Sequence, residues 1–151
     1  HESTPGSAHF FEHIAFQGTE KFPSQTILEE FCENNAIFKN AYTTKVDTVF
    51  FADGLELEST LQVATQLAYH PLLTPESLEK ERAAVIDEAR SYQFAPGADA
   101  LSQHLKNIGG DKYGELITGT IDQIEKVTHK DLIDYHATNY HTNNSLIIIC
   151  S

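Results

Sequence analysis

The sequence contains no methionine and no tryptophan, and only 2 of its 151 residues are cysteine. It opens at His1 without an initiator methionine and stops at Ser151 directly after a hydrophobic stretch, so we expect a single partial domain, residues 1–151, truncated at both ends. Cys32 and Cys150 lack CxxC spacing and fall in apolar surroundings. We interpret both as small core residues, and neither indicates a zinc site or an oxidising compartment.

Basic residues and long apolar runs are also scarce. The 10 lysines and arginines stand against 22 acidic residues, a formal net charge of −12. This balance excludes a nucleic-acid partner, because nothing in it could neutralise phosphates. No apolar run approaches the roughly 18 residues of a membrane helix, so we expect no membrane partner. The longest run, residues 146–150, predicts a buried strand.

The hydrophobic spacing predicts an α+β fold with a mostly antiparallel sheet packed with helices. Helices are expected at residues 7–16, 25–34, 55–69, 75–92 and 98–107, and after Thr120 and Thr128. Ser7, Ser24 and Thr74 are the expected caps of the helices that follow them. Residues 36–52 predict a hairpin that turns near residues 45–47, and residues 145–150 predict a final strand. These strands are too few for a doubly wound fold.

The segment His9-Phe10-Phe11-Glu12-His13 carries the main functional signal. On a helix, His9 and His13 stand at i and i+4, so both imidazoles project from one face. One zinc ion could bind both, with nitrogen–metal distances of roughly 2 Å. Glu12 directly precedes His13, close to the metal but free to act as a base. This order, H-x-x-E-H, is the inverzincin pattern.

A catalytic zinc also needs a third protein ligand, with a fourth position left for water. The helix expected after Thr74 carries Glu81 and Glu88, two turns apart on one face. From this periodicity alone, either carboxylate is a candidate ligand. Asp87 is a rival, although it points about 100° away from Glu88 on a helix.

Several segments resemble one family of zinc peptidases, the pitrilysin/insulinase family, and they follow in that family's order. Residues 6–19, with the H-x-x-E-H motif inside them, resemble its metal-binding segment. Residues 40–44, Asn-Ala-Tyr-Thr-Thr, resemble its asparagine-alanine-aromatic-threonine strand, and residues 81–88 resemble its third-ligand helix. Residues 113–114, 119–120 and 140–144 resemble later landmarks. The chain is thus similar to the N-terminal catalytic domain of this family, a roll that forms half of a chamber.

The resemblance assigns roles to individual residues. It implies that His9, His13 and Glu88 bind Zn²⁺, and that Glu12 is the general base that takes a proton from the zinc-bound water. Glu81 matches an acidic residue that supports the site from outside the metal's own ligands, by orienting a histidine ring.

The resemblance also implies a function and partners. Asn40 and Ala41 match the edge strand beside which the family lays its peptide substrate through main-chain hydrogen bonds. The implied activity is that of a zinc metalloendopeptidase acting on unfolded or short polypeptides. Its chamber would need a homologous second half, on the same chain or on a partner subunit. The alternative is a peptide-binding, non-catalytic half-chamber subunit. Relatives with that role have usually lost site residues, whereas all of them are present here.

Overall fold

A computed structural model describes residues 5–150 apart from the side chain of Lys112, so the two ends of the expected domain lie outside the described residues. The elements in order are α1 (Ser7–Ala15), α2 (Gln25–Asn34), β1 (Phe38–Thr43), β2 (Thr48–Asp53), α3 (Leu57–Tyr69), α4 (Pro75–Gln93), α5 (Ala98–Gly109), α6 (Asp111–Gly114), α7 (Ile121–Lys126), α8 (His129–Asn139) and the 3-10 turn η1 (Thr142–Asn144). Helices pack against an antiparallel sheet, which confirms the predicted α+β class. Within the described stretch, no helix is long and apolar enough to cross a membrane.

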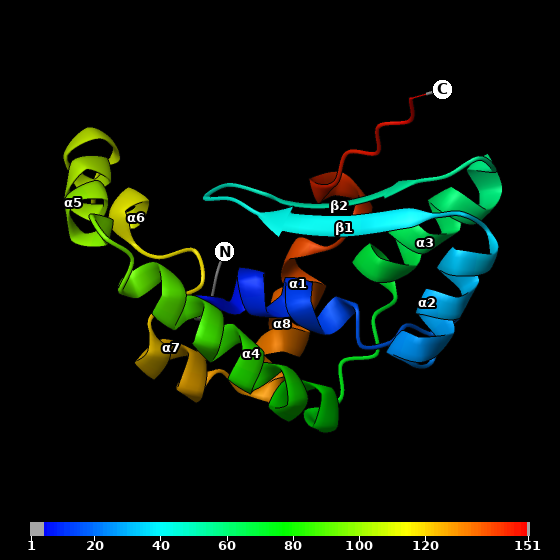
Figure 1. The fold of residues 1–151 in the computed structure, drawn as a ribbon, viewed down its shortest axis with the longest axis horizontal. Coiled ribbons are helices and arrows are strands. Elements are labelled where there is room, and N and C mark those ends of the chain that lie inside the picture. The colour runs from blue at the N-terminus through cyan, green and yellow to red at the C-terminus, as the bar shows by residue number, and fades with distance from the viewer. Residues whose placement is uncertain (1–4, 151) are drawn as a thin grey trace.

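Helix α1 lies at the centre of the fold (Figure 1). The hairpin formed by β1 and β2 packs on one side of it, and α4 packs on the other. Phe10, Phe11 and Ile14 of α1 are fully buried. They belong to a core cluster shared with α4, α7 and α8, while a second cluster joins α2 and α3 beneath the hairpin. Burial of each such side chain contributes about 2 kcal/mol, so α1 is held firmly in one rotation about its axis.

The hairpin has the register that the alternation of its side chains requires. Its strands pair from Phe38 with Asp53 to Thr43 with Thr48, and the turn closes through a 2.8 Å hydrogen bond from the Thr44 amide to the Asp47 carbonyl. Successive residues of a strand point to opposite faces. Phe38, Asn40 and Tyr42 of β1 are therefore exposed, whereas Ala41 is buried and Thr43 is half-buried. The register directs the Thr43 hydroxyl toward α1.

Most helix starts follow the predicted caps. The side chains of the capping residues accept hydrogen bonds from backbone amides of the first turn at Ser24, Thr74, Thr120 and Thr128. Cys32 of α2 is buried, which confirms its prediction as a core residue, and Leu28 is buried beside it.

The predicted cap of α1 is wrong by one residue. The N-cap is Gly6, which has φ 88°, and Ser7 is the first helical residue, with a buried hydroxyl that has no hydrogen-bond partner within residues 5–150. A side chain at Gly6 would place Cβ 2.6 Å from the carbonyl oxygen of Thr118. The left-handed backbone and this close approach both require glycine, and no capping side chain fits there.

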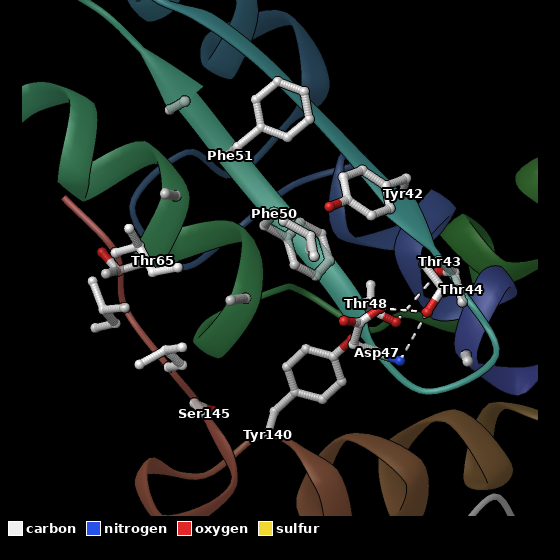
Figure 2. Close-up of a pocket in the computed structure, with 18 of the residues that line it drawn as sticks. Tyr42, Thr43, Thr44, Asp47, Thr48, Phe50, Phe51, Thr65, Tyr140 and Ser145 are labelled. Carbon is white, nitrogen blue, oxygen red and sulfur yellow. Dashed lines mark hydrogen bonds between the residues drawn. The ribbon is translucent and has the colours of Figure 1, made fainter. Parts of the chain in front are cut away.

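The predicted strand at residues 145–150 is also wrong. This segment is extended, but it pairs with no strand in the described part of the chain, and Leu146 is 83% exposed. Cys150 is exposed too, contrary to its prediction as a core residue. A broad groove separates residues 144–150 from β2 and α3, and all three segments line it (Figure 2). Consecutive apolar residues give a propensity for strand, but a strand forms only beside a partner.

Arg82 ties α4 to the end of α7. Its guanidinium donates hydrogen bonds to the carbonyl oxygens of Ile124, at 2.5 Å, and Val127, at 2.9 Å. It also lies 5.5 Å from the centre of the Phe10 ring. Carbonyl groups at a helix C-terminus have no helical partner, and the planar fork of arginine can satisfy two at once.

Replacement of Arg82 by methionine should lower the free energy of unfolding by about 2 kcal/mol, because two carbonyl groups lose a charged donor. Urea-induced unfolding of the complete protein measures the change. Arg90→Met is the matched control on the same helix, because Arg90 forms only an exposed pair with Asp87 and should matter by less than about 0.5 kcal/mol. Equal losses in the two variants would contradict the role of Arg82.

Candidate metal centre

Helix α1 brings two imidazole rings against α4. The ring centres of His9 and His13 are 4.7 Å apart. Oε2 of Glu88 lies 3.1 Å from Nε2 of His13 and 3.6 Å from Nε2 of His9. The three donor atoms all lie within 4.8 Å of one another, and residues 5–150 hold no second group of this kind. Tetrahedral zinc with bonds of roughly 2.0–2.2 Å separates its ligand atoms by about 3.4 Å, so the donor set fits one ion.

Burial keeps His9 in its neutral form. The pKa of His9 is lowered to about 4, mainly by desolvation and also by the nearby His13, while Glu88 opposes the shift. His9 is therefore neutral at pH 7, the state in which an imidazole can donate a lone pair to a metal. Its Nδ1 is buried and has no hydrogen-bond partner among the described residues, whereas its Nε2 lies 3.6 Å from Oε2 of Glu88.

A chain of polar contacts starts at Nδ1 of His13, on the opposite side of the ring from Glu88. Oε2 of Glu81 lies 3.4 Å from Nδ1 of His13. Oε1 of Glu81 accepts a 2.5 Å hydrogen bond from the Gln17 amide, whose oxygen accepts one of 2.6 Å from Lys80. A carboxylate behind a metal-binding imidazole fixes the tautomer and orientation of the ring. These contacts leave Nε2 of His13 directed at Glu88.

Glu12 of α1 points toward the turn end of the hairpin, where Thr43 pairs with Thr48. The Thr43 hydroxyl donates a hydrogen bond to its carboxylate at 2.5 Å. Burial raises the pKa of Glu12; the hydrogen bond from Thr43 and the charge of His13 lower it, and Glu88 adds to the rise. A half-buried carboxylate with a raised pKa, next to a candidate metal site, is suited to accept and return a proton.

The remaining predicted residues lie outside this cluster. Asn40 is exposed on β1, where its side-chain oxygen accepts a 2.9 Å hydrogen bond from the amide of the buried Ala41. The outer edge of β1 has no neighbouring strand in the described region. Asp87, the rival of Glu88, has a side chain that is 74% exposed and pairs with Arg90 at 2.9 Å.

Gln17 and Thr43 had no predicted role of their own. Gln17 follows His13 by four residues and lies in the turn directly after α1, so helical spacing in the sequence would place it on the side of the histidines. This signal was available in the sequence. Thr43 contacts a residue 31 positions away, and the contact depends on the hairpin register. Local spacing could not have found it.

Comparison with known proteins defines the family. The model of the insulinase family (peptidase family M16) matches residues 1–115. The beta subunit of the human mitochondrial-processing peptidase is 30% identical over 142 residues, which is 92% of this chain and 29% of that protein. The Saccharomyces cerevisiae subunit is 32% identical over 139 residues, 89% of this chain and 30% of that protein. The chain thus belongs to the insulinase family of peptidases, which confirms the predicted resemblance, and it spans less than a third of these relatives.

Solved structures share the fold at lower identity. The periplasmic protease PqqL from Escherichia coli matches 93% of this chain and 16% of its own, with a TM-score of 0.77 and 23% identity. Pitrilysin matches 95% of this chain and 16% of its own, with a TM-score of 0.70 and 21% identity. An inactive M16 peptidase domain from Pseudomonas fluorescens matches 89% of this chain and 34% of its own, with a TM-score of 0.74 and 18% identity. The fold alone therefore does not separate catalytic from inactive domains.

The buried His9 should make the metal-free protein sensitive to acid. Its pKa of about 4 in the folded state is below the ordinary value of 6.5, so the unfolded chain binds more protons between these values. The stability that neutral His9 contributes is present above pH 6.5 and is lost as the pH falls toward 4, by at most on the order of 3 kcal/mol. Urea unfolding with a chelator, at several pH values, measures the slope. His9→Gln should flatten it, and parallel curves for the two proteins would contradict this origin.

Proposed function

We propose that this protein is a zinc-dependent metalloendopeptidase that hydrolyses peptide bonds in unfolded or short polypeptides. His9, His13 and Glu88 are the metal ligands, and Glu12 is the general base. The observation that carries the proposal is the meeting of three donor atoms within 4.8 Å, with a carboxylate of raised pKa beside them. Two imidazoles and one carboxylate are a ligand set of catalytic zinc, which keeps a fourth position for water. Membership of a peptidase family supports the same conclusion.

When bound, zinc lowers the pKa of a water molecule toward 7 and polarises a carbonyl group. The residues of this chain handle the proton. Glu12 accepts it from the water that attacks the carbonyl carbon, and returns it to the amine as the carbon–nitrogen bond breaks. The products are a carboxylate and a free amine. Glu81 keeps the His13 ring in place through the cycle, and Gln17 in turn holds Glu81.

The edge of β1 is the proposed substrate surface. An extended peptide can add to an open strand edge through main-chain hydrogen bonds, largely independent of its sequence. The exposed Asn40 and the absence of a neighbouring strand in the described region support this position. Recognition of backbone atoms favours segments that are unfolded, because folded chains already use these groups.

A homologous second half completes the proposed chamber, on the same chain or on a partner. Two observations support it: the chain spans 29% of the human relative, and that relative is named as a subunit. The alternative function, a non-catalytic half-chamber that binds peptides, predicts no turnover in the complete protein. The ligand set and Glu12 favour the enzyme, because a binding role requires neither.

Glu12→Gln should abolish turnover without loss of zinc, since a carboxamide cannot accept the proton. We expect the rate of cleavage of a quenched peptide to fall by about 100-fold to 10,000-fold. Metal analysis of the same samples should show one zinc per chain in both proteins. Cleavage by this variant at the wild-type rate would remove Glu12 from the mechanism. A wild-type protein that binds zinc but cleaves nothing would support the non-catalytic alternative.

Glu88→Gln should weaken zinc binding by more than about 10-fold, because loss of even an outer partner of a metal site has an effect of that size. Competition with a chromogenic chelator measures the affinity. Asp87→Asn is the matched control, as it removes a carboxylate from the adjacent, exposed position and should change the affinity by less than about twofold. A larger loss in Asp87→Asn than in Glu88→Gln would reassign the third ligand.

A further inference from the structure

We infer that Thr43 is a positioning residue for Glu12, whose carboxylate it holds in one orientation beside the metal ligands. The inference rests on the proposed role of Glu12 as the base. It assigns a function to the end of the hairpin, which otherwise contributes no group to the metal cluster.

The contact between the two residues is close and charge-assisted. Oγ1 of Thr43 donates to Oε2 of Glu12 at 2.5 Å. Hydrogen bonds from a hydroxyl to an ionised carboxylate are this short, roughly 2.5–2.7 Å, and about twice as strong as neutral ones. The contact joins the helix that carries the histidines to a strand 31 residues further along the chain.

The hairpin in turn fixes the direction of the Thr43 hydroxyl. Thr43 and Thr48 form the last pair of the ladder, and their hydroxyl oxygens are 3.3 Å apart (Figure 2). A hydroxyl group can donate one hydrogen bond. Because Thr43 donates its hydrogen bond to Glu12, it accepts the one from Thr48. The branched threonine side chain also has few allowed rotamers in a strand. Tyr140 points toward the same end of the hairpin and its hydroxyl is buried there.

A fixed base matters because a glutamate side chain turns about several bonds. Without a partner, the Glu12 carboxylate would sample positions from which it cannot reach a proton on the attacking water. A displacement of about 1 Å in a reacting group can lower a rate on the order of 100-fold. Thr43 thus acts on the orientation of the base and not on the binding of metal or peptide.

The test uses the complete, zinc-loaded protein and a quenched peptide. Thr43→Val removes the hydroxyl but keeps the branched shape, and should lower kcat by about 10-fold to 100-fold with KM and zinc content unchanged. Thr43→Ser keeps the hydroxyl and should restore kcat to within about threefold of wild type. Thr65→Val is the control: it deletes a half-buried hydroxyl on α3 that donates to the carbonyl groups of Leu61 and Gln62, and should leave kcat unchanged.

A second measurement does not depend on turnover. Crystal structures should show the Glu12 carboxylate in one conformer in the wild type and in Thr43→Ser, and displaced or in several conformers in Thr43→Val. A single, unshifted Glu12 in Thr43→Val would overturn the inference. Thr43→Ala, which also lacks the hydroxyl, takes the place of the valine variant if that protein does not fold.

Glu12→Gln in the same experiment separates the two proposals. If Glu12→Gln is inactive while Thr43→Val keeps kcat within about twofold of wild type, only the role of Thr43 fails. If Glu12→Gln cleaves at the wild-type rate, the proposed function fails. A change in KM or zinc content alone in Thr43→Val would show that Thr43 has a different, structural role.

Discussion

The rotation of α1 about its own axis is the constraint on which the candidate site depends. Phe10, Phe11 and Ile14 are fully buried, and a shift of one residue would turn the helix by about 100° and expose them. With this rotation fixed by packing, His9 and His13 face α4 and Glu12 faces the hairpin. The spacing of the core residues and the spacing of the H-x-x-E-H motif are therefore parts of one pattern. If the motif were shifted along α1 relative to the buried residues, its side chains would no longer face α4 and the hairpin.

Helix α4 combines buried apolar residues with two glutamates on the side that faces α1. Val85 and Ala89 are fully buried against the core that α1 shares. Glu81 and Glu88 stand seven residues apart, so both lie on the side of α4 that faces α1, while Asp87 turns to solvent. One helix supplies the imidazoles and the other supplies the carboxylates. Apolar side chains hold α1 and α4 together. The interactions between the histidines and the glutamates are therefore not needed to pack the two helices.

Local physics accounts for the parts of the fold that the sequence predicts. The threonines that open α4, α7 and α8 bond to amides three residues away, and a contact of that range is visible in the spacing. The same holds for His9, His13 and Gln17. The failures depend on distant residues. Gly6 is the cap of α1 because of the Thr118 backbone, residues 145–150 need a partner strand to form one, and Thr43 reaches Glu12 through the hairpin register.

The two histidines that we propose as metal ligands are held in place by different means. His13 is oriented by hydrogen bonding, through Glu81 and the Gln17 amide behind it. The buried Nδ1 of His9 has no hydrogen-bond partner among the described residues, and packing holds that side of its ring. The burial that fixes His9 also lowers its pKa to about 4, so that a metal ion need not displace a proton from it near pH 7. One proposed ligand is thus oriented by a polar network, and the other is held and kept neutral by burial. The site combines an apolar side, which holds His9, with a polar side, which orients His13.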